Sequence, residues 1–388
     1  MIKRAITSKL MELAEKFPVL AVLGPRQSGK TTLVRAVFAE KDYVSLEDLD
    51  TRQFAVSDPR GFLASYGRGA VIDEVQRAPD LFSYIQTSID RTGRPGQFIL
   101  TGSQNILLQE NLSQTLAGRV AILRLLPFSL SELPDDIRPS TLEHYMFAGS
   151  YPRIYDHRIG PVDWYPNYIR TYIERDVRLI KNISDLIAFQ TFVKMCAGRV
   201  GQLLNLSSLG NDCGITHNTA KAWLSILEAT YIAFCVRPYH RSMNKRLIKM
   251  PKLYFYDTGL VCSLLGIQEA AHLNTHYIRG PLFESMVFSE LIKDRWNRGL
   301  DENCYFWRDR TGNEIDCILE SGGRAVPIEV KAGRTVTEDF FAGVRFWKSL
   351  TGPASDKAYV IYGGDEAQQR TAATVLSWKN MSPAFSQV

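Results

Sequence analysis

Short apolar runs alternate with amphipathic stretches along the first part of the chain. One amphipathic stretch, residues 31–38, follows the first apolar run and has the apolar spacing of a helix. Four of the apolar runs are predicted as short strands: 19–23, 43–46, 70–72 and 98–100. Strands that alternate with helices are typical of a parallel sheet with helices on both faces. The pattern therefore predicts an α/β domain over residues 1–140.

The apolar pattern changes twice after this domain. Residues 141–181 are helical in pattern and rich in aromatic side chains, and residues 185–259 predict helices followed by a basic hairpin. From Gly280 onward the pattern predicts the order helix, strand, strand, strand, helix, strand, which is a second α/β arrangement. We therefore expect a helical domain with a winged-helix module over residues 141–265 and a C-terminal α/β domain over residues 266–388.

The composition is that of a globular protein with more than one core. The chain has 388 residues, of which 45% are hydrophobic and 22% are charged. No apolar window approaches the ~18 residues of a membrane span, and the first residues lack the apolar stretch of a signal peptide. The six cysteines form no CxxC pair, which argues against a disulfide framework or a zinc ribbon. We expect reduced thiols, a cytoplasmic protein and no membrane partner.

A glycine-rich loop joins the first predicted strand to the first predicted helix. It has the full GxxxxGK[ST] spacing, in which backbone N–H groups wrap a phosphate and the helix N-terminus adds its dipole. Lys30 is expected to reach the β- and γ-phosphates of ATP, and the Thr31 hydroxyl is expected to bind Mg²⁺. The predicted nucleotide-binding residues are Gly24, Pro25, Arg26, Gln27, Ser28, Gly29, Lys30, Thr31 and Thr32.

Two acids, Asp73 and Glu74, follow the third predicted strand. Paired acids at this place often mark only a solvated strand end, but the phosphate loop upstream favours a catalytic role. Asp73 is expected to hold Mg²⁺ through water, and Glu74 is expected to polarise the water that attacks the γ-phosphate. The sequence thus predicts that the first domain binds and hydrolyses Mg-ATP.

Further positions in this domain are candidates for contact with the γ-phosphate. Ser103 or Thr101, after the fourth predicted strand, would place a hydroxyl near that phosphate, although a plain Ser/Thr loop would look the same. Arg119 is a candidate arginine finger for the nucleotide of a neighbouring copy, or else an ordinary surface residue. The finger role would require a homo-oligomer.

The middle segment has a local excess of positive charge. The chain carries a net charge of +5, which permits nucleic-acid binding without requiring it. Residues 229–256 contain six Lys/Arg residues and no acid, and the order helix, turn, helix, basic hairpin is that of a winged helix. DNA is the expected partner, through Lys245, Arg246 and Lys249, although such modules also dock proteins. The residues expected to face the groove are Thr216, His217, Asn218 and Lys221.

Two predicted strands near the C-terminus are joined by a Ser-Gly-Gly-Arg turn. If the hairpin closes on this turn, Glu320 faces Ala325. Counting back along both strands, Asp316 then lies opposite Glu329, and Lys331 shares their face. A slip of the register by one residue would separate the acids.

These cofacial residues have the chemistry of a metal-dependent nuclease. The carboxylates of Asp316 and Glu329 would bind Mg²⁺, which lowers the pKa of an attacking water. Lys331 would orient that water or stabilise charge. Glu284, in the helix predicted just upstream, would complete the metal site. The alternative is a cross-strand charge cluster on a solvated face.

Taken together, these motifs resemble a family of prokaryotic AAA-type P-loop ATPases. The stretches that carry the resemblance are GPRQSGKTTL, VIDEVQ, TGSQ and AGRV, with YIERDV and YFYDTGL further along the chain. In that family the C-terminal half is a domain of unknown function related to the PD-(D/E)xK nucleases. The residues that the resemblance assigns to the two sites are Lys30, Thr31, Asp73 and Glu74, and Glu284, Asp316, Glu329 and Lys331. One departure is that Ile315, and not proline, directly precedes the motif's aspartate.

Two functions follow from these expectations. The first is a DNA-directed ATPase in which the ATP state moves the winged helix and a nuclease-like domain on DNA. The second is a nucleotide-gated switch or scaffold that acts on protein partners and keeps a non-cleaving C-terminal domain for binding. A chaperone-like remodeller is disfavoured because the sequence has no clear aromatic-glycine pore motif.

Overall fold

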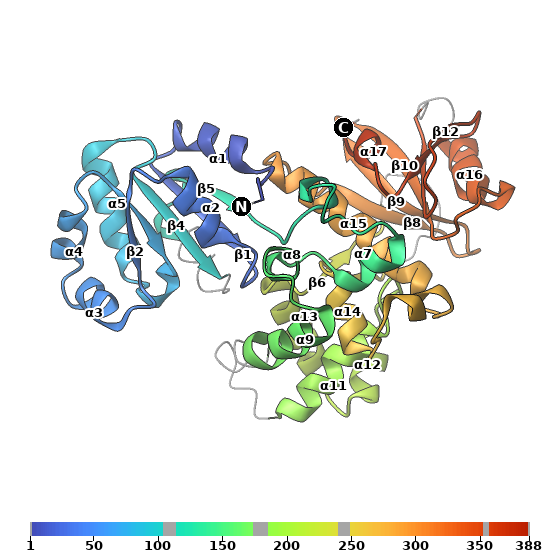
Figure 1. Cartoon of the computed structure of the whole chain (residues 1–388), viewed down its shortest axis with the longest axis horizontal. Coiled ribbons are helices and arrows are strands. Elements are labelled where there is room, and N and C mark those ends of the chain that lie inside the picture. Colours follow the sequence, from blue (N-terminus) through green and yellow to red (C-terminus); the bar gives the residue numbers. More distant parts are fainter. Residues whose placement is uncertain (1, 104–113, 174–184, 240–248, 352–356, 387–388) are drawn as a thin grey trace. The chain divides into compact units, whose positions relative to one another are not determined.

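The computed structural model describes residues 2–103, 114–173, 185–239, 249–351 and 357–386 (Figure 1). The chain forms two compact units. The first comprises Met1–Phe128, Ala229–Tyr231 and Trp296–Leu300. The second comprises Ser129–Glu228, Ile232–Arg295 and Asp301–Val388. The second unit takes up most of the two domains predicted after residue 140, and the two predicted domain boundaries stay a prediction.

The first unit is built on a parallel five-stranded sheet, which confirms the predicted α/β arrangement. The strand order is β2-β3-β4-β1-β5, and every neighbouring pair is parallel. The strands are β1 (Val19–Gly24), β2 (Asp42–Ser45), β3 (Ala70–Asp73), β4 (Phe98–Ser103) and β5 (Val120–Arg124). The helices are α1 (Thr7–Ala14), α2 (Lys30–Val37), α3 (Leu49–Ser57), α4 (Pro59–Ser65) and α5 (Leu81–Thr92), with the 3-10 turn η1 (Val75–Arg77). The edge strand β5 adds to the four strands predicted.

Strand β1 shows why both faces of this sheet are covered. Successive side chains of a strand point to opposite faces, so its apolar residues divide between two cores. Val19, Ala21 and Leu23 belong to the core that receives α3, α4 and α5. Leu20 and Val22 belong to the core that receives α1 and α2. A strand buried on both faces has the continuous apolar run that the sequence displays here.

The second unit opens with short helices and continues as a helical series with a hairpin. The first elements are η2 (Leu130–Glu132), α7 (Leu142–Ala148), α8 (Pro152–Asp156), α9 (Pro161–Tyr168) and the π-helix η3 (Ile169–Ile173). The next are α11 (Leu186–Ala197), α12 (Leu206–Asp212), α13 (His217–Ala229), β6 (Ala233–Val236) and β7 (Lys252–Phe255). Strands β6 and β7 are antiparallel, so the predicted order helix, turn, helix, hairpin is confirmed. Residues 240–248, which include Lys245 and Arg246, lie outside the described residues.

A mixed six-stranded sheet forms the C-terminal part of this unit, in the order β12-β13-β11-β10-β9-β8. The helices here are α14 (Thr258–Leu264), η4 (Ala270–Asn274), α15 (Arg279–Asn297), η5 (Glu338–Phe341), α16 (Ala342–Thr351) and α17 (Ser382–Phe385). The strands are β8 (Cys304–Arg308), β9 (Glu314–Ser321), β10 (Arg324–Lys331), β11 (Tyr359–Tyr362), β12 (Gln368–Gln369) and β13 (Thr374–Ser377). The order α15, β8, β9, β10, α16, β11 confirms the series predicted from residue 280 onward.

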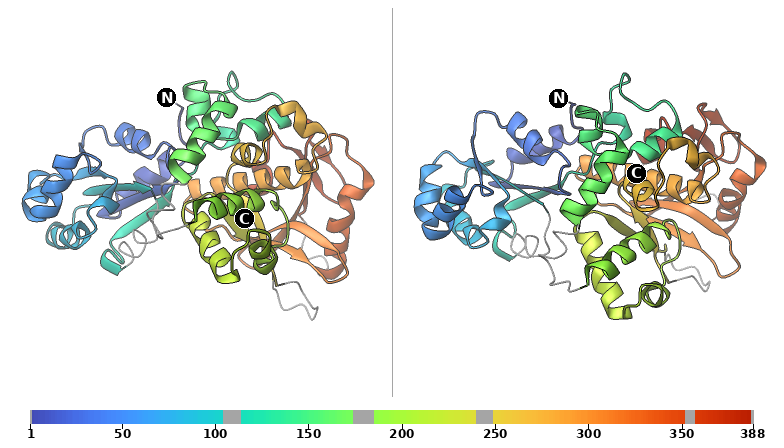
Figure 2. Two further views of the ribbon diagram at one scale, coloured as in Figure 1. Left: turned by 90° about the horizontal axis from the view of Figure 1, so that it is seen from below. Right: turned by 60° about the horizontal axis from the view of Figure 1, so that its bottom comes forward.

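Helix α15 packs along strand β7, which joins the helical segment to the C-terminal sheet within this unit. The Ser285 hydroxyl accepts a hydrogen bond from the N–H of Phe255 (3.0 Å) and donates to the carbonyl oxygen of Phe255 (2.9 Å). A separate bridge links Pro238 to Phe306 of β8. Figure 2 shows the green-to-yellow helices beside the orange-to-red sheet. The two segments that the sequence separates into domains therefore share one packed body.

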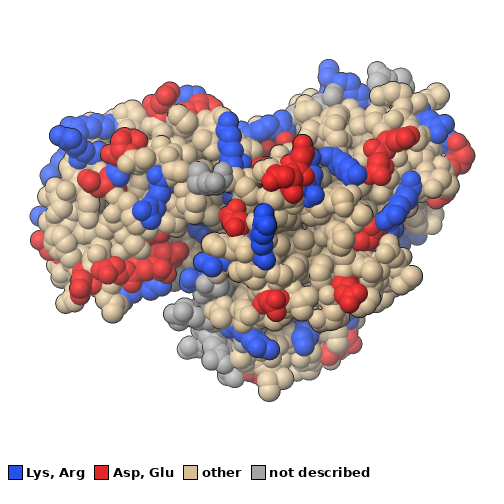
Figure 3. All heavy atoms as spheres, viewed as in Figure 1, with Lys and Arg blue, Asp and Glu red and all other residues tan. Residues whose placement is uncertain are grey.

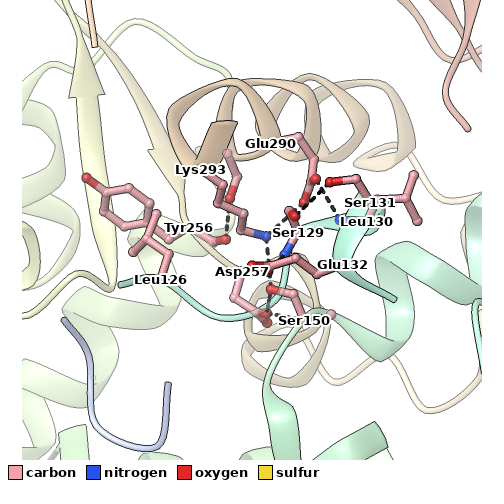
Figure 4. A network of polar contacts seen from close by, with 12 residues as sticks. Leu126, Ser129, Leu130, Ser131, Glu132, Ser150, Tyr256, Asp257, Glu290 and Lys293 are labelled. Atoms are coloured by element: carbon pink, nitrogen blue, oxygen red, sulfur yellow. Dashed lines mark hydrogen bonds and ion pairs between the residues drawn. The ribbon is translucent and has the colours of Figure 1, made fainter. Parts of the chain in front are cut away.

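A buried network of charged groups fastens α15 to the start of this unit (Figure 4). The carboxylate of Glu290 accepts hydrogen bonds from the N–H of Leu130 (2.8 Å) and the ammonium of Lys293 (2.9 Å). Lys293 also donates to the Ser150 hydroxyl (3.2 Å). Ser150 in turn donates from its N–H (2.7 Å) and its hydroxyl (2.9 Å) to Asp257, which caps α14. Each charged group has hydrogen-bond partners inside the core, so these groups specify how the segments fit together.

Replacing Asp257 by alanine is expected to lower the free energy of unfolding by about 3 kcal/mol. The substitution leaves the buried donors of Ser150 without an acceptor and removes the cap of α14. Asp185 is the matched control because it caps α11 from an exposed position. Asp185→Ala should therefore cost only about 1 kcal/mol. Urea denaturation followed by circular dichroism measures both, and equal losses would contradict the role given to the network.

The sequence predicts reduced thiols and no membrane-spanning segment. All six cysteines lie in the described part, and each is a free thiol. Among the described residues, no helix combines the length and the apolar character that crossing a membrane would need.

Candidate functional site

The predicted phosphate loop lies between β1 and α2, at the carboxyl edge of the parallel sheet. Gly24 has a φ of 154°, and a Cβ atom there would lie 2.1 Å from the carbonyl oxygen of Leu125. Gly29, just before α2, has a left-handed φ of 93°. The buried ammonium of Lys30 donates to the carbonyl oxygens of Gly24 (3.0 Å) and Pro25 (2.7 Å). The loop thus needs its glycines and holds the lysine head group against its own backbone.

Asp73, the last residue of β3, is surrounded by three hydroxyl groups. Its Oδ2 accepts hydrogen bonds from Thr31 (3.0 Å) and Tyr43 (2.8 Å), and its Oδ1 accepts one from Thr101. Burial, helped by the bond to Asp73, raises the pKa of Tyr43 to about 12, so the phenol donates at neutral pH. The two predicted Mg²⁺ ligands, Thr31 and Asp73, are therefore neighbours. Tyr43 is a contact that the sequence did not reveal.

Glu74 is held in place by two polar side chains. Its backbone has the left-handed angles φ 55° and ψ 45°, which are uncommon outside glycine and frequent at functional sites. The Gln76 amide donates to the Glu74 carboxylate and to the Ser103 hydroxyl (3.2 Å), and Ser103 donates to Glu74 (3.3 Å). Because β4 lies between β1 and β3, Ser103 at its end stands between the loop and the acids. Gln76 is a second residue that the sequence did not reveal.

These residues fit a Mg-nucleotide. Magnesium at a nucleotide site takes only one or two protein ligands and completes its shell with phosphate oxygens and water. Thr31 and Asp73 supply a hydroxyl and a carboxylate side by side, and Lys30 supplies a cation at the loop. The buried Ser28 hydroxyl has no hydrogen-bond partner among the described residues, which leaves it open to a ligand. The remaining predicted residues lie in the loop or the first turn of α2: Pro25, Arg26, Gln27 and Thr32.

Arg119 lies at the opposite edge of the sheet. It directly precedes β5, and its carbonyl oxygen accepts a hydrogen bond from the N–H of Val19, the first residue of β1 (3.3 Å). Because the strands are parallel, this is the amino edge, whereas the phosphate loop lies at the carboxyl edge. The Arg119 guanidinium pairs with Asp90 of α5, with Nε 2.6 Å from Oδ1. Arg119 is thus placed away from its own nucleotide site, and its role toward a second copy stays a prediction.

Arg4 is a buried partner of the loop that was not among the predicted site residues. Its guanidinium donates to the carbonyl oxygens of Ser28 (2.8 Å) and Leu126 (2.6 Å). It also stacks on the ring of Phe128, 4.9 Å from the centroid. A single arginine near the N-terminus carries no periodic or motif signal, so only the tertiary contacts reveal it.

The C-terminal hairpin has the predicted register. Glu320 pairs with Ala325, and the antiparallel ladder runs on toward Asp316 and Glu329. The Nζ atom of Lys331 lies 2.8 Å from Glu329 Oε2 and 3.7 Å from Asp316 Oδ2. The structure therefore brings these three residues together. Glu329 is only 3% exposed, so the cluster does not lie on a solvated face.

A second lysine, Lys252, enters the same cluster from β7. It is 4% exposed, and its Nζ atom lies 2.8 Å from Glu284 Oε1 and also pairs with Glu314. The hydroxyl of Tyr254 donates to the same oxygen of Glu284. On sequence grounds, Lys252 was included among the six Lys/Arg residues of the basic hairpin. Because this lysine is buried, that assignment was wrong for Lys252. This lysine cannot reach a DNA phosphate.

Burial and pairing shift the acids of the cluster in different directions. Burial raises the pKa of Glu284 to about 7, although the Lys252 ammonium opposes it. Burial and then the nearby Asp316 carboxylate raise the pKa of Glu329 well above its ordinary value. Burial acts to raise the pKa of Asp316, but Lys331 and Lys252 hold it below its ordinary value. Burial likewise acts to lower the pKa of each lysine, yet the surrounding carboxylates hold it above its ordinary value, so both lysines stay charged.

As arranged, this cluster does not fit a divalent cation. Within the described part of the chain, no three His, Cys, Asp or Glu side chains lie close enough together to hold a metal ion. Hard cations such as Mg²⁺ need several oxygen ligands, but lysine ammonium groups occupy the carboxylates here. The metal-binding role predicted for Glu284, Asp316 and Glu329 finds no support in this geometry.

The surface predicted to meet DNA is only partly described. All four residues expected to face the groove are exposed at or near the start of α13: Thr216, His217, Asn218 and Lys221. Lys249 is exposed as well. On the face seen in Figure 3, lysine and arginine side chains are interspersed with aspartate and glutamate. The described residues on that face form no continuous basic stripe, so their charge alone does not mark it as a nucleic-acid surface.

The site defines the class of the first unit. A strand, a glycine-rich loop and a helix that begins at Lys30, with Asp73 and Glu74 at the end of β3, form the nucleotide-binding arrangement of a P-loop ATPase domain. Residues 16–134 match the family described as AAA domain. Residues 139–271 match a domain of unknown function, DUF8612, and residues 279–381 match another, DUF4143. Neither description names a nuclease or a winged helix.

Relatives cover most of the chain. The uncharacterized proteins Rv2008c of Mycobacterium tuberculosis and Mb2031c of Mycobacterium bovis are each 28% identical over 368 residues, which is 94% of this chain and 80% of theirs. Among solved structures, the Walker-type ATPase PABY2304 of Pyrococcus abyssi is 15% identical with a TM-score of 0.46. The match covers 68% of this chain and 96% of that protein.

Proposed function

We propose that this protein hydrolyses Mg-ATP and couples the hydrolysis to DNA bound by its helix–hairpin segment. The observation that carries the proposal is the convergence of Lys30, Thr31 and Asp73 with a Glu74 that two polar side chains hold. Simple nucleotide storage would not need a carboxylate positioned beside a γ-phosphate sensor. In this proposal Ser103 is the sensor and Glu74 is the base.

The residues of the site have different roles in ATP hydrolysis. Mg²⁺, which Thr31 and Asp73 would hold, would neutralise charge on the phosphates. Lys30 and the loop N–H groups bind and orient the phosphate chain. Glu74 takes the proton of the attacking water at its carboxylate. The hydrogen bonds from Ser103 and Gln76 orient that carboxylate until a nucleotide competes for Ser103.

The second part of the proposal is that the protein binds DNA. The exposed start of α13 and the basic run around Lys245 and Arg246 support it, in the order of elements that winged helices have. In the same proposal, the C-terminal domain has the nuclease-like order of elements, and Asp316, Glu329 and Lys331 are its cofacial residues.

ATP hydrolysis with and without DNA tests the coupling. Steady-state turnover in Mg²⁺ should rise several-fold with duplex, single-stranded or branched DNA. The double variant Lys245→Glu, Arg246→Glu should bind that DNA about tenfold more weakly at fixed salt, with a flatter salt dependence. Its turnover without DNA should match that of the unaltered protein, which serves as the control. Turnover that ignores every DNA form would refute the coupling.

A second candidate function is a nucleotide-gated switch that acts on protein partners. The observation that favours it is the pairing of the C-terminal carboxylates with Lys252 and Lys331, which suits a domain that does not cleave. This candidate predicts slow ATP turnover that DNA does not change. It also predicts no effect of Asp316→Ala on that turnover.

A further inference from the structure

We propose that the buried ammonium group of Lys252 takes the place that a divalent cation holds in a metal-dependent nuclease. The C-terminal domain then has no resident divalent-metal site. This inference rests on the nuclease-like character proposed for that domain and is independent of the proposed ATP hydrolysis.

The first support is the pairing of the carboxyl groups. Glu284 and Glu314 converge on Lys252, while Asp316 and Glu329 converge on Lys331. Each carboxyl group therefore already has an ammonium partner inside the cluster. Arg308 adds a third cation, with Nη1 3.2 Å from Glu314 Oε2. A metal ion would have to displace these partners before it could gain its own ligands.

The second support is that Lys252 is fixed at both its main chain and its side chain. Its backbone pairs with Val236 of β6 and forms an isolated bridge with Leu203, so it has backbone partners in two other segments. Its Nζ atom lies 5.5 Å from the centroid of the Phe306 ring. A lysine so enclosed cannot swing out to make room. Even at the effective dielectric of a protein, its charge repels a divalent ion placed about 4 Å away.

The third support concerns the carboxylate oxygens of Glu329 and Asp316. Glu329 Oε1 has no hydrogen-bond partner among the described residues and lies against the backbone of α16. A Cβ atom at Gly343 would lie 1.9 Å from it. Asp316 Oδ2 already accepts the N–H of Val330 (2.8 Å). Asp316 Oδ2 and Glu329 Oε2, which pairs with Lys331 (2.8 Å), are therefore already engaged by groups of the protein, and a shared metal ion would have to compete for them.

Manganese binding to the full chain without nucleotide tests the proposal. Electron paramagnetic resonance of free Mn²⁺ should show that Lys252→Met gains a site that binds at least about tenfold more tightly than any site of the unaltered protein, because the repelling charge is gone while the carboxylates remain. Adding Asp316→Asn to Lys252→Met should remove that site. Lys249→Met, at an exposed lysine three residues away, is the matched control and should gain nothing.

Three outcomes would overturn the proposal. One is a folded Lys252→Met variant, verified by circular dichroism, that gains no Mn²⁺ site. The second is Mn²⁺ binding by the unaltered protein that Asp316→Asn removes, and the third is Mn²⁺-dependent DNA cleavage that the same substitution removes. The last two need no Lys252 variant, so they decide the matter if Lys252→Met does not fold. Since no assay uses ATP, a failure here is distinct from a failure of the proposed ATPase.

Discussion

Lys30→Ala is expected to weaken Mg-ATP binding by about 100-fold or more. The variant loses the only lysine of the phosphate loop, whose buried ammonium is held by loop carbonyls where the phosphates are expected to bind. Removing one partner of a buried charge pair costs about 2–5 kcal/mol, which corresponds to this loss of affinity. Equilibrium titration with a fluorescent ATP analogue measures it.

Lys16→Ala is the control for this substitution. Lys16 lies on the same unit but is exposed, and its ammonium pairs with Glu12 on the surface. Its replacement should leave nucleotide affinity unchanged. If Lys30→Ala is folded and still binds ATP as tightly as the unaltered protein does, the assignment of the nucleotide site is wrong.

Glu74→Gln is expected to keep ATP binding and lower turnover by about 10²- to 10⁴-fold. The amide has nearly the shape of the carboxylate and keeps one hydrogen-bonding oxygen for Gln76 and Ser103, but it cannot accept a proton from water. Steady-state phosphate release and nucleotide titration, measured on the same sample, separate the two effects. The result would isolate the chemical step from binding.

The control for this prediction is Glu47→Gln. Glu47 is exposed, pairs with Arg77 at 3.3 Å, and should tolerate the change with normal turnover. Normal turnover by Glu74→Gln itself would move the base to another residue. Since Asp73 is occupied by three hydroxyl donors, that residue would have to come from elsewhere in the protein or from a second copy.

The arrangement of the candidate nucleotide site was largely predictable because each of its parts is a short motif contiguous in sequence. The loop and the acids follow strands whose apolar runs are themselves easy to recognise, so local pattern suffices to place Lys30, Thr31 and Asp73. Tyr43 and Gln76 could not be predicted, because their role depends on which strand lies beside which. The order of strands in a parallel sheet is a tertiary fact that local pattern does not carry.

In the C-terminal cluster, too, local sequence pattern predicted some residues of the site and missed a tertiary contact. The turn between β9 and β10 sets the register, so the positions of Asp316 and Glu329 followed from counting residues. Lys252 belongs by sequence to a basic run, where a lysine is ordinarily solvated. Its burial against Glu284, 32 residues away, comes from the packing of α15 on β7. The sequence predicted a metal site because it identified the acids but could not show that the Lys252 ammonium is buried among them.

The position of Arg119 restricts how copies of this protein can assemble. If Arg119 serves the nucleotide of another copy, the contact joins the amino edge of one sheet to the carboxyl edge of the next. Two different patches that face opposite ways make a head-to-tail interface, not a two-fold one. Repetition of such an interface closes into a ring when the rotation between neighbours divides a full turn, and otherwise grows as a helical filament. A symmetric dimer would leave Arg119 paired with Asp90 in its own chain.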